Sequence, residues 1–370
     1  MKTSDEQLKY RIAITLIKNV GPVLAKNLIS YCGGVEAVFR EKVTNLEKIP
    51  GVGSVIAKSI RSFSDFKRAE DEIQFIQKYK IKPVFILDKE YPERLKNCID
   101  APVLLYFKGN ENLNSSRTVA FVGTRNATGY GKEQTENLIA DLAAYNVTII
   151  SGLAYGIDIT SHKAALKNNL NTIAVLAHGL DRIYPTAHKS TAQKMVEQGG
   201  LLTEYMSGTI PDRENFPSRN RIVAGISDAV VVIEAGATGG ALITAEIANN
   251  YNRDVFALPG RVDDVYSRGC NHYIKINKAA LIETAADIVY IMGWEQKESK
   301  KAPEKQQKLF IELNNEEKQL VTLLTDSGPA DIDSLILKSN LQSSKIAAAL
   351  LNLEFNGIIK SLPGKMYRLI

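Results

Sequence analysis

A strand–helix–strand pattern across residues 119–151 constrains the fold of this chain more than any other feature. An apolar, β-branched run, Val119-Ala-Phe-Val-Gly-Thr-Arg125, precedes an amphipathic helical pattern, and a second apolar run ends at Ser151-Gly152. Two strands joined by a helix in this way are parallel. Loops after the carboxyl ends of parallel strands are where open α/β sheets bind ligands. The sequence therefore predicts a binding site in the two loops that follow these strands.

The alternation of strands and helices continues through residues 117–292. Further strands are expected at residues 172–176, 201–203, 229–233 and 254–258. Strands that are almost continuously apolar are buried on both faces. The pattern thus predicts an α/β fold whose doubly wound parallel sheet is covered by helices on both faces.

Four further segments flank this core. Residues 1–72 look all-helical and contain two glycine turns, at Gly21 and at Gly51-Val-Gly53. The segment around the second turn has the form of a helix-hairpin-helix. The sequence allows two interpretations: the turns contact a DNA backbone, or they only connect helices. Residues 73–116 are a connecting segment expected to add strands to the sheet edge. Residues 293–308 are predicted to be a flexible linker, and residues 309–370 form three helices and a hairpin that resemble a winged helix.

Composition narrows the class of protein. The 370 residues suffice for two or three domains, and the net charge of +5 is not concentrated in the core. The three cysteines are far apart and the four histidines lack metal spacing, which argues against a metal site or a disulfide framework. The N-terminus lacks the apolar core of a signal peptide, and no segment reads as a membrane span. We therefore expect a cytoplasmic protein with no membrane association.

The strongest candidate site combines three glycine turns. Gly123-Thr124-Arg125 follows the first core strand, Ser151-Gly152 the second, and Gly239-Gly240 a later one. Glycine lets backbone amides approach a ligand, Thr124 and Ser151 offer hydroxyl donors, and the Arg125 guanidinium can hold two oxygens of one phosphate. The arrangement predicts phosphate binding, and the alternative is that the turns only connect strands to helices.

A second candidate is the run Phe216-Pro-Ser-Arg-Asn-Arg221. On a helix Arg219 and Arg221 would point about 200° apart, whereas in an extended segment they would face the same way. We expect at least one arginine in the pocket and the other in an internal ion pair.

Acidic residues stand at several loop positions. They are Asp158, Asp181, Glu204 and Glu234. A glycosidase needs two carboxylates placed on either side of a sugar bond, but Asp158 opens a helix and is expected to be its N-cap. GxSxG and P-loop motifs are absent, and the glycines do not form GxGxxG. No catalytic residue, metal or cofactor is therefore predicted.

The order and spacing of these motifs resemble the DprA/Smf family of bacterial DNA-processing proteins. The match covers roughly residues 83–285 and also includes Leu242-Ile-Thr-Ala245 and Val255-Phe-Ala-Leu-Pro-Gly260. The resemblance implies an extended Rossmann-like core that binds and protects incoming single-stranded DNA during natural transformation. It further implies a homodimer that loads the recombinase RecA and displaces single-strand-binding protein.

The resemblance also implies a set of nucleic-acid-binding residues. Carried over to this chain, these are Gly123, Thr124, Arg125, Ser151, Gly152, Lys163, Arg219, Asn220 and Arg221, and Gly240 belongs to the third glycine turn. Two positions depart from the family pattern. Tyr155 stands where arginine is usual, which removes a cation but offers an aromatic face for a base. Gly239 stands where serine is common.

Two functions from different classes follow. The first is a single-stranded DNA-binding protein that performs no chemistry. The second is a nucleotide phosphoribohydrolase-like enzyme that cleaves an N-glycosidic bond, because such enzymes share a glycine-arginine turn and a glycine-rich turn after a glutamate. Their Pro-Gly-Gly-x-Gly-Thr loop is missing here, since the corresponding residues read Glu234-Ala-Gly-Ala-Thr-Gly-Gly-Ala241.

A last expectation concerns assembly. The segment after Gly260 is more apolar than a terminal cap requires, with Tyr273, Ile274, Ile276, Leu281 and Ile282. We expect a symmetric dimer to bury part of this segment, and the alternative is that these residues cover the sheet of their own chain.

Overall fold

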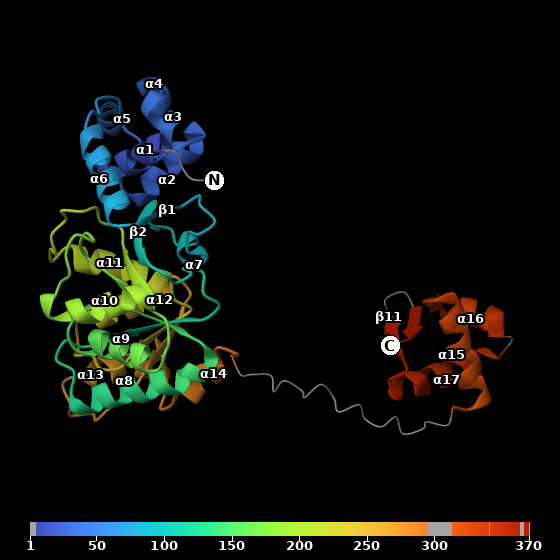
Figure 1. The fold of residues 1–370 in the computed structure, drawn as a ribbon. Helices are drawn as coiled ribbons and strands as arrows, with labels where there is room; N and C mark the ends of the chain where they lie inside the picture. The colour runs from blue at the N-terminus through green and yellow to red at the C-terminus, as the bar shows by residue number, and fades with distance from the viewer. Residues whose placement is uncertain (1–4, 295–312, 340, 363–365, 370) are drawn as a thin grey trace. The chain divides into compact units, whose positions relative to one another are not determined.

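The computed structural model describes residues 5–294, 313–339, 341–362 and 366–369. The chain divides into two compact units, Met1–Glu295 and Gln296–Ile370 (Figure 1). Residues 295–308 of the expected linker lie outside the described residues. None of the helices in the described part of the chain combines the length and apolar character that a transmembrane span requires.

The first unit is built on a nine-stranded sheet in the order β1-β2-β6-β5-β4-β3-β7-β8-β9. The strands are β1 Lys82–Phe85, β2 Leu104–Gly109, β3 Thr118–Val122, β4 Thr148–Ser151, β5 Thr172–Val175, β6 Gly199–Thr203, β7 Ala229–Val232, β8 Asp254–Ala257 and β9 Ala280–Leu281. Neighbouring strands are parallel throughout the stretch β6-β5-β4-β3-β7-β8-β9 of this sheet. Strands β1 and β2 add an antiparallel edge beside β6, as expected for the connecting segment.

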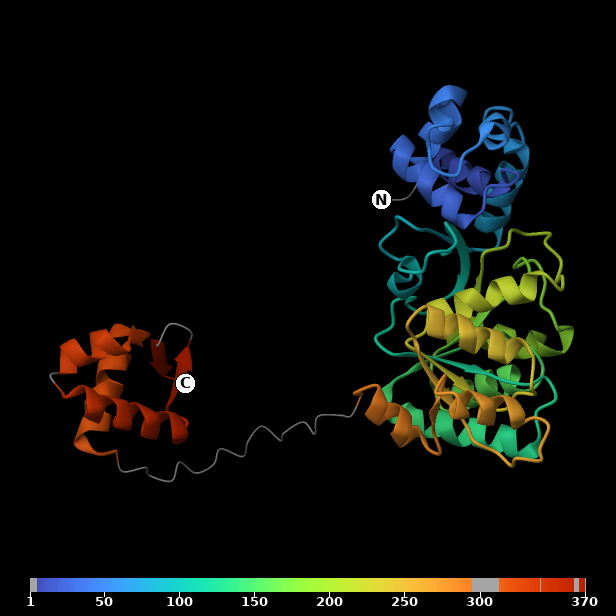
Figure 2. The same cartoon turned by 180° about the vertical axis from the view of Figure 1, so that it is seen from behind.

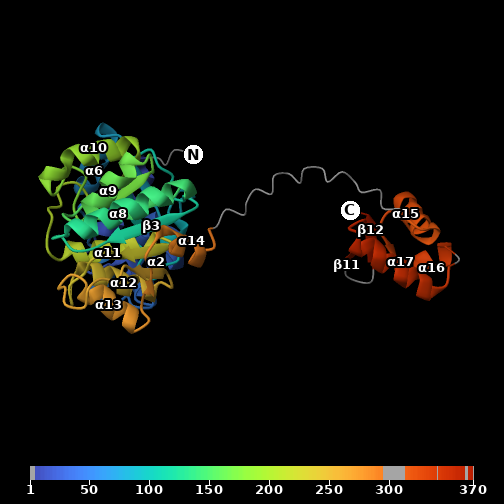
Figure 3. The same ribbon diagram turned by 90° about the horizontal axis from the view of Figure 1, so that it is seen from below.

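Helices cover both faces of this sheet, so the predicted doubly wound fold is confirmed (Figure 3). The helices of the core are α7 Glu93–Lys96, α8 Gly129–Leu142, η1 Ala143–Tyr145, α9 Ile157–Lys167, η2 Thr186–His188, α10 Lys189–Glu197, α11 Asn215–Gly225, α12 Gly240–Asn250, α13 Arg268–Lys275 and α14 Ala285–Ile291. Alternate residues of β3 pack on opposite faces. Val119 and Phe121 join the core beneath α8, α9 and α14, while Ala120 and Val122 join that beneath α11, α12 and α13. A strand with two buried faces has to be apolar throughout, which explains the sequence pattern.

Strand β3 marks the point where the strand order reverses. Its neighbours are β4 on one side and β7 on the other, and the chain winds outward from it in both directions. A crevice forms outside the carboxyl ends of the strands at such a point. The topology thus places the loops after β3, β4 and β7 around one hollow.

Six helices precede the sheet, and the predicted helical N-terminal region is confirmed. They are α1 Asp5–Leu16, α2 Pro22–Cys32, α3 Val35–Arg40, α4 Val43–Leu46, α5 Ser54–Arg61 and α6 Phe66–Lys78. Their buried residues join the same apolar cluster as β1 and β2, and Figure 2 shows these helices from behind. The α6 carboxylate of Glu72 accepts the amide of Ser207 at 3.0 Å, while Arg68 donates to the Ser207 carbonyl. These helices therefore form one packed body with the sheet.

The described residues of the second unit form three helices and a small antiparallel sheet. Its elements are α15 Asn315–Ser327, β10 Ala330–Asp331, α16 Ile332–Ser339, α17 Ser343–Phe355, β11 Ile359–Leu362 and β12 Met366–Leu369. A separate apolar cluster that includes Leu320, Leu335 and Leu350 forms its core. The capping box of Asn314 and Glu317 begins the first helix. The expected winged-helix architecture is confirmed.

Candidate functional site

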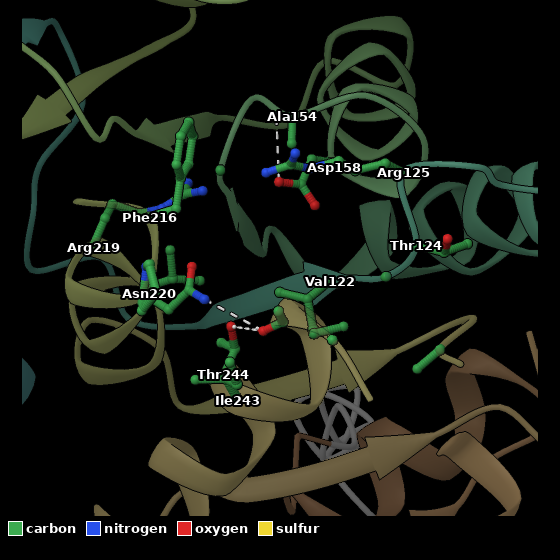
Figure 4. A pocket seen from close by; sticks show the side chains of 18 of the residues that line it. Val122, Thr124, Arg125, Ala154, Asp158, Phe216, Arg219, Asn220, Ile243 and Thr244 are labelled. Atoms are coloured by element: carbon green, nitrogen blue, oxygen red, sulfur yellow. Dashed lines mark hydrogen bonds between the residues drawn. The ribbon is translucent and has the colours of Figure 1, made fainter. Parts of the chain in front are cut away.

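A cavity of about 350 Å³ opens at the carboxyl ends of β3, β4 and β7. The loop after β3 provides Gly123 to Arg125, and the β4 loop provides Gly152 and Ala154. The other wall comes from the start of α11 and from the turn between β7 and α12 (Figure 4). Three glycine turns predicted from sequence thus meet around one hollow.

The turn after β3 is fixed by close packing. A Cβ at Gly123 would lie 2.3 Å from Cγ1 of Ile157, and one at Gly156, where φ is +77°, would lie 2.1 Å from the Thr124 carbonyl oxygen. The amide of Thr124 donates to the Glu234 carbonyl at 2.8 Å. This amide is therefore not free for a ligand, while the side chains of the turn remain at the cavity.

Arg125 brings an unpaired positive charge to the cavity. Its guanidinium carbon lies 5.3 Å from the ring centroid of Phe216, and the residue is exposed. No carboxylate in the described part of the chain forms an ion pair with it, although Asp158 also lines the cavity. A cation held against an aromatic face but not neutralised is suited to an incoming anion.

Arg219 provides a second guanidinium at the cavity wall and is only 4% exposed. Its Nη1 donates to the Val175 carbonyl at 2.6 Å, and its buried Nε has no partner among the described residues. Burial lowers the pKa of Arg219, the Asp158 carboxylate raises it, and the nearby Arg125 lowers it again. Arg219 keeps hydrogen-bonding capacity for a ligand that enters the cavity.

Asp158 is the one carboxylate in the cavity lining. Its expected role as an N-cap is wrong, because the cap position of α9 is Gly156, whose positive φ the turn requires. Asp158 instead accepts the amide of Ala154 at 3.3 Å, closing the loop after β4. Burial raises the pKa of Asp158, and Arg219 opposes this. Two guanidinium groups against one carboxylate leave the cavity positive.

The start of α12 adds backbone donors to the opposite wall. Gly239, with φ of +148°, is the cap residue and forms no side-chain cap hydrogen bond. The first amides of an uncapped helix are free donors at the positive end of the helix dipole. Asn220 donates to the Gly240 carbonyl at 3.3 Å, which ties α11 to this turn.

Arg221 does not line this cavity. It projects from the other side of α11, where Nη2 lies 2.5 Å from Oε2 of Glu204 and Nη1 donates to the Asp100 carbonyl. Because residues 215–225 form a helix, the two arginines cannot share a ligand. We expected one arginine in the pocket and the other in an internal ion pair. In the structure Arg219 lines the cavity and Arg221 forms the ion pair.

Three other expected binding residues also fall outside the lining. Ser151 is completely buried and its hydroxyl donates to the Phe121 carbonyl at 2.7 Å, so it is not a free donor. Tyr155 is half exposed, with its ring 4.8 Å from that of His188. Lys163 is exposed on α9. Phe216 lines the cavity and is absent from the binding residues expected from sequence, although it begins the candidate run Phe216–Arg221.

The remaining acidic residues have structural partners. Glu234 is buried and accepts both the amide and the hydroxyl of Thr128, the N-cap of α8. A Cβ at Gly131 would lie 2.4 Å from this carboxyl group, so α8 packs directly on it. Asp181 pairs with Arg182, and Glu204 pairs with Arg221. No free pair of catalytic carboxylates remains at the cavity among the described residues.

Comparisons with known proteins match all parts of the chain. Residues 82–293 match the family of the DNA recombination-mediator protein A, residues 301–365 the DprA winged helix domain, and residues 12–73 the helix-hairpin-helix motif. Protein Smf of Synechocystis sp. is 32% identical over 99% of both chains. A putative DNA processing protein DprA of Mycobacterium tuberculosis is 34% identical over 91% of this chain and 88% of its own length.

Two solved structures are similar to large parts of this chain. That of DNA processing protein A from Streptococcus pneumoniae has a TM-score of 0.67 at 34% identity and covers 78% of this chain and 98% of its own. A structure of the Helicobacter pylori protein, described as showing a single-stranded DNA binding mode, has a TM-score of 0.53 at 29% identity and covers 58% of this chain and 95% of its own.

Proposed function

Because the chain belongs to the DprA/Smf family of DNA-processing proteins, we propose that it binds single-stranded DNA in the cavity between β3, β4 and β7. The observation that carries this proposal is the unpaired Arg125 guanidinium, which lies against Phe216 at the mouth of a cavity that also holds Arg219. Cations beside an aromatic ring suit a ligand that presents phosphates and bases together.

The donors of the cavity suit the backbone of a nucleic acid and not its sequence. Arg125 can hold two oxygens of one phosphate, and the uncapped amides of α12 can bind another anionic oxygen. Lining residues such as Gly123, Gly152 and Gly240 present backbone and carry no groups for reading base edges. We therefore expect binding with little dependence on base sequence.

The preference should be for flexible single strands. A cavity of about 350 Å³ is smaller than a duplex, whereas a single strand can turn one phosphate inward and leave its bases splayed. The similar Helicobacter pylori protein is described as having a single-stranded DNA binding mode, which agrees with this proposal. In the cell, this binding would protect DNA that enters during transformation and pass it to recombination.

The proposal also includes the proteins with which this chain would interact. We propose that the protein acts as a homodimer, displaces single-strand-binding protein and loads RecA on the bound strand. These roles rest on membership of the family and not on any contact in this chain.

We also propose that the protein performs no chemistry on the bound strand. The phosphoribohydrolase alternative needs a glutamate free to act on an N-glycosidic bond, but the Glu234 carboxylate is held by Thr128 and packed against Gly131. Incubation with nucleoside monophosphates should release no free base. Release of free base by the wild type that is lost in Glu234→Gln would instead support the phosphoribohydrolase-like enzyme.

The test of DNA binding is a titration with a single-stranded oligonucleotide and its blunt duplex across a salt series. Log affinity for the single strand should fall with log salt at a slope of about −0.7 for each phosphate neutralised. Equal affinity for the two forms, or the absence of salt dependence, would contradict the proposal.

A further inference from the structure

Three side chains form a row at one side of the cavity. The guanidinium carbon of Arg125 lies 5.3 Å from the ring centroid of Phe216, which lies 6.2 Å from the ring centroid of Tyr184. Arg125 and Phe216 belong to the cavity lining, whereas Tyr184 does not. The row therefore leads from a cation that lines the cavity to an aromatic ring outside the lining.

The position of Tyr184 is set by the loop that follows β5. The carbonyl of His178 in this loop accepts the hydroxyl of Thr203 at 2.9 Å, and Oδ1 of Asp181 accepts the amide of Gly208 at 3.0 Å. These bonds tie the loop to β6 and to the segment that follows it. Tyr184 therefore belongs to a loop that hydrogen bonds fix in position, and 48% of its surface is exposed.

The two aromatic rings differ in what they can offer to a ligand. The Phe216 ring has the Arg125 guanidinium over it and Tyr184 as its aromatic neighbour. Tyr184 stands at the outer end of the row and is half exposed, so it has ring surface that no protein group covers. A large half-exposed ring contributes little to the core, and bases of a single strand stack on such surfaces whatever their sequence.

We propose that Tyr184 stacks a base of the single strand whose phosphate is bound at Arg125. This inference rests on the proposed function and extends the binding site beyond the cavity toward the loop after β5. The ligand at this position is a nucleobase of any identity, held by its face. Through the row of Arg125, Phe216 and Tyr184 the strand makes one phosphate contact and one base contact. The two contacts are close enough to be made by neighbouring nucleotides.

Tyr155 is the competing aromatic residue. It has comparable exposure, 50%, but its ring lies edge-on against His188 and it has no ring contact with Phe216 among the described residues. The continuous row favours Tyr184 as the first stacking position next to the bound phosphate.

The test compares two variants at Tyr184 with the wild type in the full chain. Tyr184→Ala should weaken binding of a single-stranded oligonucleotide roughly tenfold, since removal of a stacking side chain typically has this effect. Tyr184→Phe should bind like the wild type, because the ring and not the hydroxyl carries the contact. The salt slope should be unchanged in both, since no phosphate contact is lost.

Two further measurements make the assignment specific. Tyr184→Trp should show fluorescence quenching on addition of DNA that exceeds the response of the wild type, which contains Trp294. Tyr31→Ala is the matched control, because Tyr31 is 64% exposed on α2 in the N-terminal helices, and its affinity should not change.

The outcomes separate this inference from the proposed function. If the wild type binds single strands but Tyr184→Ala binds equally well, the stacking role is wrong and the DNA-binding function stands. A Tyr184→Ala defect that Tyr184→Phe shares, or that follows a lowered melting temperature, would also overturn it. If the wild type shows no binding to single strands, the proposed function itself fails.

Discussion

The guanidinium of Arg219 occupies the space in which residue 152 would carry its side chain. A Cβ added to Gly152 would lie 1.9 Å from Nη1 and 2.4 Å from Cζ of Arg219. Because Nη1 also donates to the Val175 carbonyl at 2.6 Å, the arginine cannot move aside without losing this bond. Glycine at the end of β4 is therefore needed to place a buried cation at the cavity wall.

We predict that Gly152→Ala lowers both stability and DNA affinity. Overpacking of this kind typically costs about 1–3 kcal/mol, and displacement of Arg219 should weaken single-strand binding roughly tenfold. Urea unfolding and an oligonucleotide titration on the same variant measure the two effects. Gly129→Ala is the control, since a Cβ there meets no atom within 4 Å. Wild-type affinity in a folded Gly152→Ala protein would remove Arg219 from the site.

Replacing Arg125 should affect binding and leave stability unchanged. A guanidinium–phosphate pair is worth roughly 1.5–3 kcal/mol, so Arg125→Ala should lose about tenfold or more in single-strand affinity. The salt slope should become shallower by about 0.7, because one phosphate contact is lost. Arg125→Lys should recover part of the affinity, since an ammonium keeps the charge but loses the planar fork.

Arg117 offers a matched control for this variant. It stands just before β3, at the opposite end of the strand, and its guanidinium carbon also lies near an aromatic ring, 5.8 Å from that of Trp294. Arg117→Ala removes the same charge and should leave the affinity and the salt slope unchanged. An equal loss in both variants would mean that net charge, and not the position of Arg125, determines binding.

The architecture could be predicted from sequence because its signals are local. The apolar runs that became β3 and β7 are buried on both faces, and periodicity alone separates them from the helices between them. The location of the site followed from the same reasoning, because parallel strands bring Gly123, Gly152 and Gly240 to one edge of the sheet. All three line the cavity.

The individual side chains of the site could not be predicted as well. Ser151 is the last residue of the expected strand β4, but its hydroxyl donates to the Phe121 carbonyl and is not free for a ligand. Arg221 lies two residues from Arg219, yet the helical phase of α11 turns it toward Glu204. Such outcomes depend on partners that are distant in sequence. The contact of Phe216 with Arg125 could not be predicted either, because these two residues are also distant in sequence.

The apolar segment expected at a dimer interface is only partly exposed. Ile282 is completely buried in the core of its own chain, whereas Ile276, directly after α13, is 42% exposed and Leu281, in the edge strand β9, is 47% exposed. Tyr290 on α14 is 74% exposed. The proposed interface therefore narrows to Ile276, Leu281 and α14, where apolar side chains stay partly exposed among the described residues.

We predict that Leu281→Glu converts a dimer to a monomer, because a carboxylate would have to be desolvated in a symmetric interface. Sedimentation at micromolar concentration measures the mass. Leu87→Glu is the control, since Leu87 is 63% exposed after β1 at the opposite sheet edge. A monomeric wild type, or a Leu281→Glu dimer of unchanged affinity, would contradict the proposed interface.

The ion pair between Arg221 and Glu204 makes a prediction about pH. Both side chains are largely buried, with 12% and 15% exposure. Arg221→Ala would leave a buried carboxylate without its partner, at a cost of roughly 3 kcal/mol in the free energy of unfolding near neutral pH. Single-strand affinity should change little in the folded variant, because Arg221 does not line the cavity.

The deficit of Arg221→Ala should shrink in acid. Burial already raises the pKa of Glu204, and Arg221 opposes this rise, so loss of the arginine raises the pKa further. A carboxyl whose pKa is higher in the folded state than in the unfolded state binds more protons when folded, and stability then increases as pH falls through that raised pKa. Urea unfolding of both proteins between pH 7 and pH 5 should therefore show the variant approaching the wild type. Adding Glu204→Gln to Arg221→Ala should remove the pH dependence of the difference; a deficit that is constant with pH would mean that packing by the arginine, and not its charge, holds this region together.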